Sequence, residues 1–122
     1  MGEAVCATKD FTISVSAATF SFIATPEKTT AAPGEKVKIN VAITNTSSGK
    51  IQVCMHLRDK DTGEILDRNP SLCGNGDLEG VGDFSGIYAF AIDKGQTRTE
   101  PLYVKDMPTT ALNARVIVCA KF

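Results

Sequence analysis

Four cysteines and a single histidine are the side chains of this sequence best suited to chemistry. Cys54 and His56 stand two positions apart, so on a β-strand their side chains share one face. With Cys73 they offer the sulfur and nitrogen ligands that suit zinc or copper. A persuasive site would add a second histidine or a Cys-x-x-Cys pair, and the sequence contains neither. We therefore predict no metal and no other cofactor, and a disulfide between Cys54 and Cys73 instead.

Cys6 and Cys119 lie near the two ends of the sequence. In a β-sandwich the first and last strands are often neighbours, so a bridge between these residues is geometrically reasonable. Such a bridge would stabilise the fold by about 2–4 kcal/mol if it is unstrained. An even number of cysteines in a small all-β chain fits two disulfides and an oxidising environment. Other pairings, and four buried free thiols, stay open as alternatives.

Nucleophilic catalysis would have to use His56, because the chain has no other histidine to act as the base. The residues expected on its strand face include no carboxylate to orient the ring, and a lone histidine on a strand is usually a surface residue. The D-x-D spacing within 59–64 suggests Ca²⁺, but the EF-hand pattern is not completed and a hairpin turn explains these residues more simply. Weak Ca²⁺ binding by Asp77, Glu79 and Asp83 in the Gly-rich loop stays open as an alternative. We predict that the protein is not an enzyme.

The charges are balanced, with 13 basic and 14 acidic residues and a net charge of −1. No block of like charge offers a footprint for nucleic acid or an anionic membrane. The longest apolar stretch, Ile87–Ile92, is far shorter than the roughly 20 residues of a membrane-spanning helix. The first residues show no basic segment followed by an apolar block, so we also expect no secretory signal in this chain.

These side chains would be positioned by β-strands, because the clearest periodicity in the sequence is two. From Glu35 to Thr44, valine and isoleucine alternate with mostly polar residues between turn-forming segments. The run Ile51–Arg58 alternates in the same way, which predicts an outward face made of Gln52, Cys54, His56 and Arg58. The residues 59–63 then form a hairpin turn in which Gly63 takes a positive φ.

Further strands are predicted at Phe11–Ser16, Thr19–Thr25, Gly86–Ile92, Thr97–Val104 and Leu112–Lys121. Pro101 marks its strand as an edge strand or a bulge. The Gly-rich segment 73–83 shows no pattern of strand or helix, and no convincing helix is predicted elsewhere. About seven to eight short antiparallel strands with regular turns are typical of a sandwich. We therefore predict an all-β, immunoglobulin-like sandwich, a single domain over 1–122, with 1–10 as an extended N-terminal arm or first strand.

Several segments are similar to the immunoglobulin-like superfamily: Phe20–Pro26, Ala32–Val37, Val41–Ser47 and Tyr88–Thr97. The pattern of strands and turns resembles CARDB-like cell-surface and adhesion domains and viral immunoglobulin-like decoration domains. The resemblance implies the sandwich fold and a place outside the cell, on a virion or on a cell surface. The antibody-type arrangement of two cysteines around a core tryptophan is absent, since the sequence has no tryptophan.

Three classes of non-enzymatic function fit these observations. The first is a structural or interaction protein that docks on a larger assembly, of the virion-decoration or filament type, with a protein partner that can be a second copy. The second is an adhesion or spacer module of a bacterial or archaeal cell-surface protein. The third and weakest is a glycan or small-ligand binder, because sugar sites usually stack on aromatic rings. For an edge-strand contact we expect the N-terminal arm and Thr97–Val104; the candidate interface residues are Thr97, Thr99, Leu102 and Val104.

Overall fold

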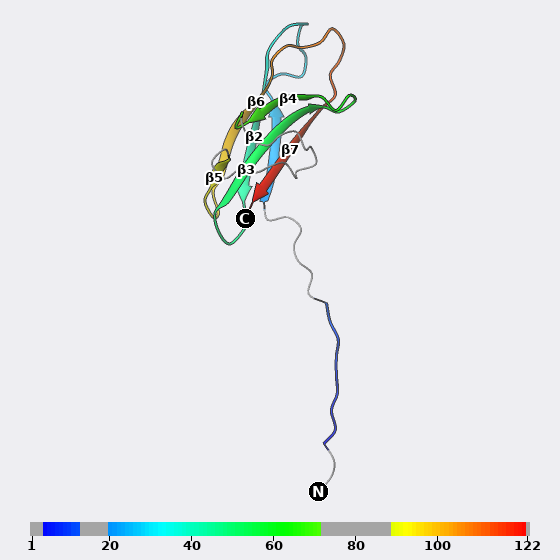
Figure 1. Cartoon of the computed structure of the whole chain (residues 1–122), viewed down its shortest axis with the longest axis vertical. Coiled ribbons are helices and arrows are strands. Elements are labelled where there is room, and N and C mark those ends of the chain that lie inside the picture. The colour runs from blue at the N-terminus through cyan, green and yellow to red at the C-terminus, as the bar shows by residue number, and fades with distance from the viewer. Residues whose placement is uncertain (1–3, 13–19, 72–88, 122) are drawn as a thin grey trace.

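The computed structural model describes residues 4–12, 20–71 and 89–121, and this part of the chain is all β, with no helix (Figure 1). Seven strands form two antiparallel sheets, consistent with a β-sandwich. The strands are β1 Phe20–Pro26, β2 Val37–Asn45, β3 Ile51–Asp59, β4 Ile65–Asn69, β5 Phe90–Ile92, β6 Thr97–Val104 and β7 Ala114–Lys121. The predicted all-β fold with about seven to eight antiparallel strands is therefore confirmed.

The first sheet has the order β1-β2-β6, with β2 in the middle. Alternate residues of β2 are buried over its whole length, because they face the second sheet. They are Val37, Ile39, Val41, Ile43 and Asn45. The predicted alternation of this strand is confirmed, and it makes β2 one wall of the core.

The second sheet is built around β3. Residues 51–53 pair with β5 and residues 55–58 pair with β4, whereas residues 52–59 pair with β7. Since residues 52 and 53 pair with both β5 and β7, β7 occupies one edge of β3, and β4 and β5 share the other. The inward side chains of β3 are fully buried: Ile51, Val53, Met55 and Leu57. They pack against the β2 wall and against Leu102 and Val104 of β6 to form the hydrophobic core.

Turns follow the sequence prediction where they can be checked. Gly63 has a φ of +79° in the β3–β4 hairpin, a conformation that glycine adopts without steric cost. Asp59 Oδ1 accepts hydrogen bonds from the amides of Asp61 (2.8 Å) and Thr62 (3.3 Å). The Asp59 carboxylate thus closes the hairpin turn, in agreement with the prediction that these acidic residues form a turn.

The predicted strand Phe11–Ser16 has a different outcome. Phe11 and Thr12 are exposed and form no strand, while residues 13–16 lie outside the described residues. The described arm, residues 4–12, leads away from the sandwich instead of adding a strand to it (Figure 1). Likewise Phe90–Ile92 is a strand, whereas the predicted beginning of that strand, 86–88, lies outside the described residues.

Candidate protein-binding groove

Sheet edges are the places where a sandwich can bind another chain, since backbone donors and acceptors there lack a partner strand. Among the described strands, β1 and β6 form the edges of the first sheet, and β7 forms one edge of the second. The edge of β6 is covered by side chains of β4, whereas the edges of β1 and β7 border an apolar groove.

The edge of β6 is closed by side chains of β4. Asn69 Nδ2 donates to the carbonyl of Pro101 at 2.7 Å, and the amide of Tyr103 donates to Asp67 Oδ2 at 2.7 Å. Pro101 itself has no N–H to offer a further strand. Pro101 does lie on an edge strand, as predicted, but the second half of that edge is already occupied.

The predicted interface residues on β6 divide between two faces of the strand. Thr97 and Thr99 are exposed, and the Thr97 hydroxyl is hydrogen-bonded to that of Thr44 at 2.8 Å. Leu102 and Val104 point inward and are 0% and 5% exposed. The structure corrects the prediction for these two residues: they belong to the core and offer no contact surface, because alternate residues of a strand lie on opposite sides.

The edges of β1 and β7 enclose an apolar groove of about 510 Å³. Phe22, Ala24 and Pro26 of β1 line one side, and Ala114 and Val116 of β7 line the other. Its floor consists of core residues, among them Val37, Ile39 and Leu57. We call this feature the β1–β7 groove.

Core-facing side chains along this groove remain partly exposed to solvent, whereas a closed sandwich would bury them. Phe22 pairs with Ile43 and lies on the core-facing side of β1, yet it is 38% exposed. Val116 and Val118 of β7 are only partly buried, whereas their partners on β3, Leu57 and Met55, are fully buried. Among residues 4–12, 20–71 and 89–121, none covers the core between β1 and β7.

The rim of the groove carries little unbalanced charge. Lys28 lies at the rim, and its Nζ is 2.6 Å from Glu35 Oε2. The hydrogen bond from Lys28, together with one from the Ala32 amide, lowers the pKa of the Glu35 carboxyl. Because this lysine is already paired, the described lining offers mainly apolar surface.

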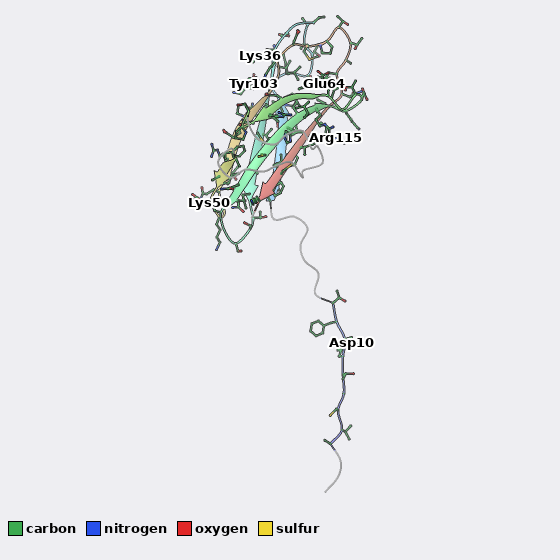
Figure 2. All side chains as sticks on the ribbon, in the orientation of Figure 1. Asp10, Lys36, Lys50, Glu64, Tyr103 and Arg115 are labelled. Carbon is green, nitrogen blue, oxygen red and sulfur yellow. The ribbon has the colours of Figure 1, made fainter. Side chains whose placement is uncertain are left out.

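The N-terminal arm is the other large exposed apolar feature of the described chain. Val5 is 96% and Phe11 77% exposed, and every residue from 4 to 12 is exposed. Figure 2 shows Asp10 far from the sandwich, on the opposite side from Arg115 at the start of β7. An apolar arm and an apolar groove thus occur in one chain without contacting each other.

No known relative helps to interpret these features. Searches with family models, curated proteins and solved structures found no match. The immunoglobulin-like and CARDB-like resemblance therefore stays a prediction.

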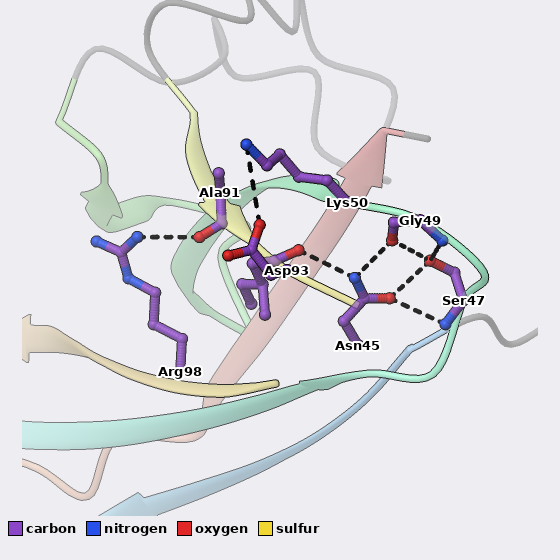
Figure 3. A network of polar contacts seen from close by, with 8 residues as sticks. Asn45, Ser47, Gly49, Lys50, Ala91, Asp93 and Arg98 are labelled. Atoms are coloured by element: carbon purple, nitrogen blue, oxygen red, sulfur yellow. Dashed lines mark hydrogen bonds and ion pairs between the residues drawn. The ribbon is translucent and has the colours of Figure 1, made fainter. Parts of the chain in front are cut away.

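A buried asparagine network lies where β2 ends (Figure 3). Asn45 is 0% exposed, and its Nδ2 donates to the carbonyls of Gly49 (2.8 Å) and Ile92 (2.9 Å). Its Oδ1 accepts from the Ser47 amide (2.9 Å) and hydroxyl (2.6 Å). Asn45 therefore ties β2 of one sheet to β5 of the other. From the sequence, this segment was predicted only as a polar turn. An asparagine two positions before a serine could have indicated the local Asn45–Ser47 hydrogen bonds, but not the bond to Ile92.

Cys54 and His56 share one face of β3, as predicted, but both are only 1% exposed. The prediction that they are exposed at the surface is therefore wrong. Alternation identifies which residues share a face of a strand, but it does not reveal whether that face is buried. β3 is a central strand with neighbours along both edges, so its side chains are less exposed than those of an edge strand. Among the described residues, no three His, Cys, Asp or Glu side chains gather into a group that could hold a metal ion. Asp77, Glu79 and Asp83 lie outside the described residues.

The two predicted disulfides have different outcomes. Cys6 and Cys119 are free thiols, Cys6 exposed on the arm and Cys119 buried on β7, so the predicted bridge does not close this single chain. The arm carries Cys6 away from β7 (Figure 1). Cys54 is not among the free cysteines, and its predicted partner Cys73 lies outside the described residues, so that pairing stays a prediction.

The two free thiols should react at very different rates with iodoacetamide. Burial raises the pKa of the Cys119 thiol, which lowers its thiolate fraction and its access to reagent together. We expect Cys6 to be alkylated more than about tenfold faster than Cys119 in the folded protein at pH 8. Peptide mass spectrometry over a time course measures both rates, and in guanidinium chloride they should converge. Equal rates in the folded protein would contradict the burial of Cys119.

Proposed function

We propose that this chain is a non-enzymatic, immunoglobulin-like structural protein that docks on a larger assembly, of the virion-decoration or filament type. The single observation that carries the proposal is the β1–β7 groove, where the core-facing Phe22 remains 38% exposed. A groove between two sheet edges suits an extended protein segment, which can pair with an edge strand and place alternate side chains on the core. An open edge of this kind is a liability for a protein that acts alone.

A protein partner fits the groove better than a sugar does. Its lining is mostly aliphatic, and Phe22 is its one aromatic side chain among the described residues. Glycan sites usually need aromatic faces together with several polar groups. The described residues also contain no helix long and apolar enough to cross a membrane. The partner that we propose is a protein, with no nucleic acid and no membrane insertion. We place the chain outside the cell, on a virion or a cell surface. The Cys54–Cys73 disulfide belongs to the same proposal.

Fractionation of the protein from its natural source tests this function. We expect the wild-type chain to elute with particles or filaments far larger than itself, and Phe22→Asp to elute as a small protein, because the carboxylate disfavours docking in an apolar groove. Ile23→Asp is the matched control: Ile23 neighbours Phe22, is 71% exposed and lies on the outer face of β1. Thermal melting of both variants separates loss of docking from loss of folding. Wild-type protein found only at monomer size would overturn the proposal.

A further inference from the structure

The arm has the side-chain pattern of a strand that is covered on one side. In an extended conformation Val5, Ala7, Lys9 and Phe11 share one face, and the opposite face carries mainly polar or small residues. Nothing in the described chain covers the apolar side chains at the two ends of this run, Val5 at 96% and Phe11 at 77% exposed. An isolated extended arm with such residues is stable only when it finds a sheet edge and an apolar surface together.

β7 offers both. It pairs with β3 along one edge, and its other edge has no partner strand among the described residues. Its core-facing residues Val116, Val118 and Ala120 are half-buried and pack against the core. The described arm, residues 4–12, spans about 30 Å when extended, and the eight residues of β7 span about 26 Å. One arm is therefore long enough to cover the edge of β7.

The direction of the strands decides whose arm fits. The groove is lined by Pro26, the last residue of β1, and by Ala114, the first residue of β7, so these two strands run in opposite directions. The arm precedes β1 in the chain, and β1 begins at Phe20, opposite Asn45, at the end of the strand away from Pro26. If a chain's own arm turned back along β1, it would lie parallel to β7. The arm of a second copy is free to lie antiparallel, as every other pair in this sheet does.

We infer that the N-terminal arm of one copy pairs antiparallel with β7 of a second copy and covers the β1–β7 groove there, with Phe11 as its anchor. This inference rests on the proposed function and names the partner as the chain itself. Because donor arm and acceptor groove are different surfaces, the contact is head to tail, and repetition gives an open chain of subunits.

One register satisfies both faces of the arm. With Phe11 opposite Ala114 at the groove, Ala7 lies opposite Val118 and Val5 opposite Ala120, each on the core side. Lys9 then lies opposite Val116, where its aliphatic stem covers apolar surface and its ammonium reaches the rim. On the outer side, the same register places Cys6 opposite Cys119. The two free thiols of the structure are thereby brought together between copies.

Purified full-length variants test the donation. Val5→Asp/Phe11→Asp removes the donor at positions that are exposed in the single chain, so folding is unaffected. Phe22→Asp removes the acceptor, and Ala114→Arg at the exposed rim is a second acceptor variant in case the first folds poorly. We expect wild type and the Ile23→Asp control to associate in a concentration-dependent way. Each defective chain alone should associate at least about tenfold more weakly, the effect of exposing one buried phenylalanine.

Mixing the two defective chains is the decisive step. The acceptor-defective chain still has its arm, and the donor-defective chain still has its groove, so native mass spectrometry should show a 1:1 heterodimer and no longer chains. Assembly that is indifferent to Val5 and Phe11 would overturn the inference. So would a wild-type monomer that melts at a lower temperature once Phe11 is replaced, because its own arm then fills the groove. If that monomer still fractionates with large particles from its source, the docking function stands and only arm donation falls.

The register has its own readout. Oxidised glutathione can take up the two electrons and two protons that the Cys6 and Cys119 thiols lose when their S–S bond forms, and it leaves as two glutathione thiols. We expect a ladder of disulfide-linked chains on non-reducing gels, abolished by Cys6→Ser and by Val5→Asp/Phe11→Asp. A heterodimer that forms without any Cys6–Cys119 peptide after oxidation would overturn this register.

Discussion

Asn45→Ala is expected to lower the free energy of unfolding by about 3 kcal/mol, one of the two largest effects in this molecule. The side chain is fully buried and makes four hydrogen bonds, to Gly49, to Ile92 and two to Ser47. Alanine leaves the buried carbonyl of Ile92 without this donor, and an unsatisfied buried group costs about 1–3 kcal/mol by itself. The loss of the turn contacts to Ser47 adds to that cost.

Chemical denaturation monitored by far-UV circular dichroism measures this change, since the chain has no tryptophan for fluorescence. Asn113→Ala is the matched control. Asn113 Nδ2 also donates a side-chain hydrogen bond, to Asp61 Oδ2 at 3.0 Å, but this pair is exposed. We expect Asn113→Ala to change stability by less than about 0.5 kcal/mol, as surface substitutions usually do. Equal effects of the two substitutions would mean that burial of the Asn45 network is not what stabilises the turn.

The sequence was informative wherever local periodicity coincides with burial. β2 has one face on the core along its whole length, so alternating valine and isoleucine were enough to place it. Thr97–Val104 was predicted with the bounds that β6 has, and Pro101 marked it correctly as an edge strand. Gly63 was predicted with a positive φ because the hairpin needs a residue without a Cβ at that position.

Features that depend on distant parts of the chain were not accessible in this way. His56 and Cys54 alternate correctly, yet nothing near them in sequence indicates that the outer face of β3 is covered. The β1–β7 groove arises because strands almost a whole chain apart border the same part of the core. Periodicity placed Leu102 on a strand, but it did not decide which of the two faces of β6 carries the core.

Leu102→Ala tests that last assignment and should lower the free energy of unfolding by about 2–5 kcal/mol. Leu102 is 0% exposed and lies opposite Ile39 of β2, so the deleted carbons leave a cavity inside the core. Ile23→Ala removes the same number of carbons from a side chain that is 71% exposed, and we expect a change within about 0.5 kcal/mol. Denaturant titration of both variants gives the two values.

The result also separates the two roles considered for β6. If Leu102 contacted a partner, its truncation would weaken association and leave the isolated chain almost as stable as wild type. If it belongs to the core, the isolated chain loses stability at any protein concentration, because a monomer's unfolding does not depend on mass action. Since the edge of β6 is already closed by Asp67 and Asn69, we expect the second outcome. Among the described strands, that outcome leaves the edges of β1 and β7, which border the β1–β7 groove, available to another chain.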